Sequence, residues 1–250
     1  MLLAEEAARD EVQPIYISVG LAWEAAEQEA VRQFLARGFA HPHIRPLVSL
    51  AVDMSDVYPA VHWARTGVAP AYHTPDEDVY IPGRNIVLLS KAGVFCGAAH
   101  LERLVIGTLD HNPFPDATPS FRHAMASALS QGMAHPLVID APYARVGKAE
   151  VIQRGARAGV RLELTLSCMN ARQDGDRFPR HCGVCSKCRE RHDAFVEAAD
   201  HLADTGREGV GFAALVRIVE HGAVGQAAVV MNFDAFTFAD GGAAAFIFDD

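Results

Sequence analysis

A cysteine-rich stretch opens with Ser167-Cys168-Met169-Asn170 and closes with His181-Cys182-Gly183-Val184-Cys185-Ser186-Lys187-Cys188-Arg189. Its last three cysteines are separated from one another by two residues, and Cys168 lies upstream across a polar loop. Thiolates at this spacing on a tight turn can face one cation, and a fourth thiolate from a separate segment completes a tetrahedron. Gly183 suits such a turn, because a backbone that bends around a metal often needs a positive φ. The stretch therefore predicts a metal site formed by Cys168, Cys182, Cys185 and Cys188.

The spacing favours structural zinc. Four thiolate ligands leave no open coordination position, so the metal would hold the fold together without taking part in chemistry. An iron–sulfur cluster stays open as an alternative, although no proline follows Cys188. Disulfides are disfavoured, because a cytosolic chain keeps its thiols reduced. The fifth cysteine, Cys96, stands alone in an apolar stretch and is predicted to be a core residue.

Composition limits the class of protein. Half of the 250 residues are apolar, which is enough for a sizeable core, and the net charge of −9 argues against direct nucleic-acid binding. No apolar run is long enough to span a bilayer. The first residues lack the basic region of a secretory signal, so we expect a cytoplasmic protein with no membrane partner.

Outward from the cysteines, apolar runs alternate with helical patterns. Strands are expected at 12–19, 44–52, 104–109 and 136–139, and helices at 23–34, 86–100, 121–129 and 148–158. This alternation predicts an α/β fold with a doubly wound, mostly parallel sheet. Pro14 suggests an edge or strand-start position for the first strand. The helix at 86–100 is apolar nearly all round, which predicts burial. Residues 53–81 lack periodicity and predict a long lid or binding loop.

In such sheets ligands bind outside the carboxyl ends of the strands. The loops that follow the four predicted strands would therefore converge, which brings four polar residues into one candidate site: Arg84, Asn85, Asp116 and Lys148. Gly107, inside the third strand, could let a ligand approach the backbone closely.

Each of these residues also has a purely structural interpretation. Arg84 could only pair with a carboxylate, and Asp116 could only cap the helix after Pro119. Lys148, near a helix start, could be solvated, and Gly107 could mark a bulge.

Several motifs in order resemble the 7-cyano-7-deazaguanine synthase family, which makes the nitrile precursor of the modified tRNA base queuosine. They are Ile81-Pro82-Gly83-Arg84-Asn85, Phe114-Pro115-Asp116, Lys148-Ala149-Glu150-Val151-Ile152, Leu164-Thr165-Leu166-Ser167-Cys168 and the cysteine run that ends at Arg191. The likeness extends from about Val12 to Phe195. Order and approximate spacing together make it much more specific than any single motif.

The resemblance implies an adenine-nucleotide α-hydrolase-like domain at 1–160, a zinc-binding helical segment at 161–198 and a tail of unknown role at 199–250. It implies that 7-carboxy-7-deazaguanine and ammonia are converted to the nitrile at the expense of ATP with Mg²⁺. The acid is adenylated, ammonia gives an amide, and a second ATP drives dehydration. A homodimer is possible.

The resemblance also assigns roles to residues. Asp116 would meet the deazaguanine, and Lys148 would neutralise phosphate or developing charge. Arg84 and Asn85 would line the substrate or nucleotide site, to which Gly107 is added from the strand pattern alone, and the four cysteines would bind zinc.

Two departures from the family pattern stand out. Ala117 and Thr118 follow Asp116 where the family usually has an arginine. The Ser-Gly-Gly-x-Asp-Ser loop that wraps pyrophosphate, with the strand before it, is not found. A fragment or misassigned start, or a natural variant without ATP chemistry, would account for this. We expect the strand at 12–19 to lack a neighbour, unless residues 227–231 supply a substitute, and no ATP turnover by residues 1–250.

Three functions compete on the sequence alone. The first is the ligase, and the second is a non-catalytic relative that binds a nucleotide, a deazapurine or a partner protein. The third is a zinc-ribbon interaction module, for which the basic residues near the cysteines are few: Lys187, Arg189 and Arg191.

Overall fold

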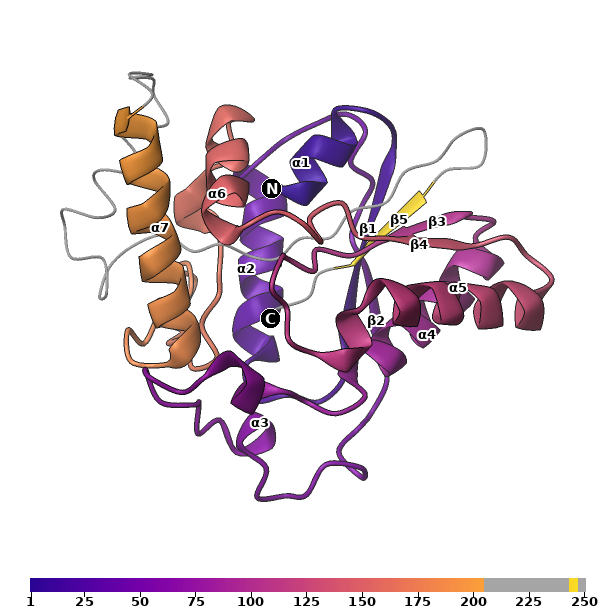
Figure 1. Ribbon diagram of the computed structural model, residues 1–250, viewed down its shortest axis with the longest axis horizontal. Helices are drawn as coiled ribbons and strands as arrows, with labels where there is room; N and C mark the ends of the chain where they lie inside the picture. Colours follow the sequence, from indigo (N-terminus) through magenta and orange to yellow (C-terminus); the bar gives the residue numbers. More distant parts are fainter. Residues whose placement is uncertain (205–242, 247–250) are drawn as a thin grey trace.

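A computed structural model describes residues 1–204 and 243–246. Its centre is a parallel sheet in the order β2-β1-β5-β3-β4 (Figure 1). The strands are β1 (Val12–Ser18), β2 (Val48–Ala51), β3 (Arg103–Val105), β4 (Val138–Asp140) and β5 (Ala243–Phe246). Each strand predicted from the sequence overlaps an observed one, and the second and third are clearly shorter than predicted. Gly107 consequently lies beyond the end of β3 rather than inside it.

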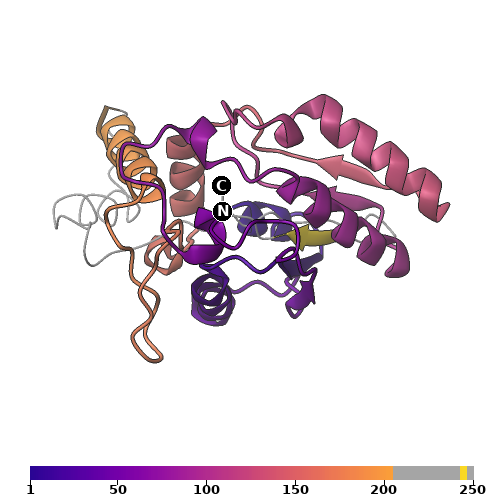
Figure 2. The same ribbon diagram turned by 90° about the horizontal axis from the view of Figure 1, so that it is seen from below.

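Helices cover both faces of the sheet, which confirms the doubly wound α/β fold. Figures 1 and 2 show α4 and α5 on one side and α1 and α2 on the other, with α6 and α7 farther out. The helices are α1 (Leu2–Ala7), α2 (Glu24–Arg37), α3 (Trp63–Thr66), α4 (Arg84–Ala98), α5 (Pro119–Met133), α6 (Lys148–Arg157) and α7 (Ser186–Asp204). Three short 3-10 helices are η1 (Asp76–Val79), η2 (Pro115–Ala117) and η3 (Leu162–Leu164). Among the helices described, none is both long and apolar enough to cross a membrane.

The position between β1 and β3 is filled by β5. Ala243–Phe246 pairs in parallel with both neighbours, with Val12 opposite Ala243 on one side and Arg103 opposite Ala243 on the other. The expectation that the strand at 12–19 lacks this neighbour is therefore wrong. The backbone groups along β1 and β3 require hydrogen-bond partners, and β5 supplies them. The substitute strand predicted at 227–231, and a helix that the sequence suggests at 210–219, lie outside the described residues.

Pro14 lies near the start of an interior strand, so of the two predicted positions the strand start is observed and the edge is not. Val12 donates its N–H to the carbonyl of His43 at 2.7 Å, on the β2 side of β1. Two residues later Pro14 faces the same side, and regular pairing with β2 begins only after it. The side chain of Gln13 instead donates to the carbonyl oxygens of Pro14 and Pro46, at 3.0 and 2.7 Å. The missing N–H of the proline thus leaves the ladder intact.

Helix α4 is buried on one face only, so the prediction of burial all round is wrong. Leu88 and Leu89 are buried, whereas Ile86 and Val94 are 46% and 57% exposed. The helix packs on β1, β3 and β5 and on α5, which leaves an apolar outer strip in solvent. Cys96 is fully buried in the core, as predicted.

Candidate functional site

Asp116 lies in η2 and is only 4% exposed. Its Oδ2 accepts the backbone N–H of Asn85 at 3.2 Å, and the Asn85 Nδ2 donates to Oδ1 and to the Asp116 carbonyl oxygen, both at 3.3 Å. Asn85 is the second residue of α4, where free N–H groups and the helix dipole favour an anion. Asp116 therefore caps α4. The helix after Pro119 is capped instead by the hydroxyl of Thr118.

Burial raises the pKa of the Asp116 carboxyl above its ordinary value, despite the bonds from Asn85 and the nearby charge of Arg84. A buried carboxylate is normally paired or fully hydrogen-bonded. The raised pKa shows that the donors around Asp116 do not fully compensate its negative charge. A ligand that brings further N–H donors would stabilise the ionised form.

A small cavity lies beside this carboxylate. It is lined by Val79, Tyr80, Ile81, Arg84, Asn85, Phe114, Asp116 and Met169. The rings of Tyr80 and Phe114 stack with centroids 5.2 Å apart and form an aromatic wall. The space measures about 20 Å³, enough for one water, whereas small-molecule sites measure about 300–1,000 Å³. A heterocycle can enter only if part of the wall moves.

Arg84, Asn85 and Asp116 are thus brought together, whereas Lys148 does not line the cavity. Lys148 is the first residue of α6 and follows β4, so it lies at the carboxyl edge of the sheet, as does the N-terminus of α4. Its Nζ contacts Glu190 Oε1 at 2.7 Å, and the Nζ of Lys187 contacts Oε2 at 2.9 Å. Burial alone would raise the pKa of Glu190, and the two ammonium groups lower it to about 2.

Gly107 is buried beyond the end of β3 and does not line the cavity either. The arginine that the family places after the Pro-Asp pair has no equivalent in the cavity. Arg122, in the first turn of α5, is buried and donates to the carbonyl oxygen of Ala117 at 2.6 Å. Its side chain lines a different space, so it does not replace the family residue.

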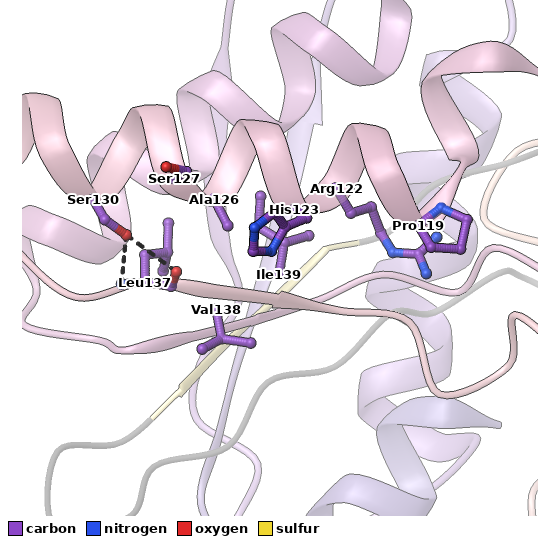
Figure 3. A pocket seen from close by; sticks show the side chains of 9 residues that line it. All are labelled: Pro119, Arg122, His123, Ala126, Ser127, Ser130, Leu137, Val138 and Ile139. Carbon is purple, nitrogen blue, oxygen red and sulfur yellow. Dashed lines mark hydrogen bonds between the residues drawn. The ribbon is translucent and has the colours of Figure 1, made fainter.

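That second space is a larger cavity of about 320 Å³ between α5 and β4 (Figure 3). The side chains of Arg122, His123 and Ala126 approach it from the helix. The hydroxyl of Ser130 accepts the N–H of Leu137 at 3.0 Å and lies 3.2 Å from its carbonyl oxygen. Ser130 thereby caps the outward backbone groups at the start of this edge strand, which limits pairing with another chain. None of the predicted site residues lines this cavity.

The four predicted metal ligands converge, and their sulfur atoms all lie within 4.8 Å of one another. Cys188 Sγ is 3.9 Å from that of Cys182 and 3.5 Å from that of Cys185. A tetrahedral zinc site with bonds of about 2.3 Å places its sulfurs about 3.8 Å apart, so the cluster fits this ion. Backbone N–H groups of Asn170 and Cys182 donate to Cys168 Sγ, both at 3.3 Å, which fixes this ligand. Gly183 has the positive φ, 76°, that the turn was predicted to need.

The four thiols share their protons through hydrogen bonds. These bonds, that of Cys168 first, lower the pKa of Cys182 and bring the pKa of Cys185 to about 7, whereas the pKa values of Cys168 and Cys188 are raised. Zinc with four thiolates carries a net charge of −2. Arg191, 4% exposed and 4.2 Å above the ring of Phe195, has Cys188 as its negative neighbour and is placed to offset this charge.

Sequence reasoning missed five wall residues: Val79, Tyr80, Ile81, Phe114 and Met169. Phe114 lies inside a motif that was singled out, and Met169 follows a metal ligand, so proximity to these motifs was the available signal. Their side-chain directions depend on contacts between distant segments.

Comparison with known proteins covers both the Asp116 cavity and the cysteine cluster. Residues 64–199 match the model of a family described as queuosine biosynthesis protein QueC, and this match contains the Asp116 cavity and all four cysteines. The chain belongs to the QueC family.

The match excludes β1, β2 and β5 and covers the part of this chain that carries both sites. The chain is similar to proteins named 7-cyano-7-deazaguanine synthase. That of Rhizorhabdus wittichii is 30% identical over 71% of this chain and 76% of its own length. Those of Azoarcus sp. and Methanoculleus marisnigri are 36% and 38% identical over 51% and 47% of this chain. The chain spans about half the length of these last two relatives, 57% and 52%.

Proposed function

We propose that the protein acts in queuosine biosynthesis as a synthase of the carbon–nitrogen ligase kind, which converts 7-carboxy-7-deazaguanine and ammonia to 7-cyano-7-deazaguanine. Membership in the QueC family and the names of its relatives support this role. The observation that carries it is the buried, under-compensated carboxylate of Asp116 beside an aromatic wall.

The chemistry of that carboxylate suits a deazaguanine. The guanine-like edge of the substrate presents a ring N–H and an exocyclic amino group, which together donate two parallel hydrogen bonds to a carboxylate. Such donors would stabilise ionised Asp116 and lower its pKa. The rings of Tyr80 and Phe114 offer an apolar surface to the flat heterocycle. Asn85 keeps the carboxylate oriented during binding.

ATP with Mg²⁺ is the proposed co-substrate, because a carboxylate oxygen leaves only after activation. Adenylation of the acid releases pyrophosphate, ammonia displaces AMP to give an amide, and a second adenylation of the amide oxygen lets AMP and a proton leave as the nitrile forms. Lys148, at the same edge of the sheet, is the proposed partner of a phosphate group, which would require it to exchange Glu190 for that anion.

Zinc is the proposed metal of the cysteine cluster, with a structural role. The cytoplasm is the proposed compartment, and the four closely spaced thiols support it because a reducing compartment keeps such ligands free of disulfides.

The direct test is ATP-dependent formation of 7-cyano-7-deazaguanine, followed by mass spectrometry with the full chain, ATP, Mg²⁺ and ammonia. The proposal requires product with wild type, which would overturn the expectation of no ATP turnover drawn from the missing Ser-Gly-Gly-x-Asp-Ser loop. Asp116→Asn should then form product about a hundredfold more slowly, since a charged hydrogen-bonded pair is lost. Failure of wild type to bind or convert 7-carboxy-7-deazaguanine would contradict the proposal.

One observation favours a second function, binding without catalysis. Lys148 is held by Glu190 and does not reach the cavity. The two functions can be distinguished by experiment, because a binding protein binds the deazapurine but leaves ATP unchanged.

A further inference from the structure

Met169 physically joins the cysteine cluster to the Asp116 cavity. It directly follows the ligand Cys168, is 4% exposed, and forms part of the cavity wall. A residue adjacent to a metal ligand has its backbone fixed when the metal is bound. One wall of the cavity is therefore positioned by the cluster.

A second connection runs through residues 70–76, which are anchored on the first turns of α7. Ala71 forms an antiparallel bridge with the ligand Cys185, and Ser186 donates its N–H to the carbonyl oxygen of Pro70 at 3.1 Å. Arg189 donates to the carbonyl oxygen of Thr74 at 3.4 Å.

The second connection continues into the cavity wall. The same guanidinium of Arg189 pairs with Asp76 at 3.5 Å. Asp76 begins η1, and η1 ends at Val79, the first of three consecutive wall residues that end at Ile81. Arg189 is thus the side-chain link between the metal-binding segment and this wall.

The opposite wall has a different support. Asn85, at the start of α4, and Asp116, in η2, are held to each other by the hydrogen bonds between them. Loss of the metal therefore leaves the recognition carboxylate in place and releases the Tyr80 and Met169 side of the cavity. Because the cavity holds only about 20 Å³, this movable side must also open to admit a ligand.

We propose that Met169 and Arg189 are positioning residues that couple metal occupancy of the cysteine cluster to ligand affinity at the Asp116 cavity. The proposal rests on the proposed function only for the identity of the ligand. With the anchors intact, the wall shifts as an ordered unit around the ligand. Without them, binding must also order a loose segment, and affinity falls by that entropy cost.

The experiment compares zinc-loaded full-length wild type with Arg189→Ala. We measure zinc content, hydrogen–deuterium exchange of residues 70–81, and affinity for 7-carboxy-7-deazaguanine by calorimetry. Arg189→Ala should retain its zinc, exchange faster at residues 74–81, and bind about tenfold more weakly, within the usual range for coupled sites. Arg189→Lys keeps the charge facing Asp76 and should recover part of the loss. Chelation of wild-type zinc should accelerate exchange at 70–81 as well.

Arg180→Ala is the matched control. Like Arg189, Arg180 is close to a metal ligand in sequence, two residues before Cys182, but it is half exposed and pairs with Asp174 rather than with residues 70–76. Its exchange pattern and affinity should equal those of wild type. Met169→Ala should weaken binding while leaving zinc and the exchange of 70–81 unchanged, because it alters the wall without cutting the anchor.

The outcomes separate the two proposals. Wild-type exchange at 74–81 in Arg189→Ala overturns the coupling, whatever the ligand data. Faster exchange with equal affinity in the two proteins also overturns it. Faster exchange together with no binding by wild type contradicts the proposed deazapurine function and supports the anchoring role of Arg189.

Discussion

The cysteine cluster and the Asp116 cavity are neighbouring sites built in different ways. The cluster takes all its ligands from Cys168 to Cys188, within one short segment. The cavity takes its wall from four separate segments between Val79 and Met169. The comparison teaches that residue spacing alone predicts a site whose ligands are close in sequence. A site whose wall residues are far apart in sequence depends on the packing of the whole sheet and its helices.

The largest effect is expected from Cys185→Ser. Structural zinc contributes on the order of 10 kcal/mol in small zinc folds, which is comparable to the whole stability of a domain. The variant should lose its metal, and the segment 168–188 should unfold. Elemental analysis and circular dichroism check this. Iron, or no metal, in wild type purified without chelator would show that the cluster is not a zinc site.

Cys96→Ala is the control for that experiment. Cys96 is buried in the core and is not among the clustered cysteines. The substitution should leave metal content unchanged and cost about 1 kcal/mol for the small space created.

Asp116→Ala tests whether the cavity, unlike the cluster, depends on long-range contacts. It leaves the N–H of Asn85 and the start of α4 without their acceptor. We expect the free energy of unfolding to fall by about 2 kcal/mol, the usual range for a lost helix cap and a buried unpaired donor. Urea unfolding measures this, and zinc content should not change. A simultaneous loss of zinc would mean that the two sites are not separately supported.

A smaller effect is expected from pH. Burial raises the pKa of Asp116 in the folded state, so the folded protein binds this proton more tightly than the unfolded chain. Its contribution to stability is therefore present below the ordinary pKa of about 4 and is lost as pH rises through the raised value.

The amide side chain of Asp116→Asn does not titrate, so a comparison with this variant isolates the contribution of the Asp116 proton to stability. The stability of wild type relative to this variant should be greater near about pH 4 than near about pH 8. An equal difference at both values would show that Asp116 is adequately compensated.

The smallest effect is expected from Lys148→Met. Glu190 loses one ammonium partner but keeps Lys187, so the cost should be about 1 kcal/mol. A double-mutant cycle with Glu190→Gln measures the pair directly. If Lys148 serves a phosphate, ATP-dependent turnover should fall by far more than stability does. A change in turnover no larger than that in Arg154→Met, a half-buried residue on the same helix that pairs with Glu150, would remove Lys148 from the proposed site.

The spacing of apolar residues along the chain predicted the helices and strands that bury one continuous face. The strand at β1 and the helices α2, α5 and α6 were predicted within a few residues, because their apolar spacing is repeated over several turns or alternations. Prediction failed where a neighbour decides the environment. Helix α4 has an apolar outer strip in solvent, and Pro14 fits an interior strand because the pairing with β2 starts after it.

By itself the sequence determined the cysteine cluster, the alternation of strands and helices, and the family. These depend on residue type and spacing along a few turns of chain, which geometry converts directly into neighbouring side chains. Only the tertiary structure decided that Asp116 caps α4, that Lys148 pairs with Glu190, and that β5 fills the centre of the sheet. Each of these is a contact between segments 31 or more residues apart, whose formation depends on how the whole chain satisfies its buried backbone and charged groups.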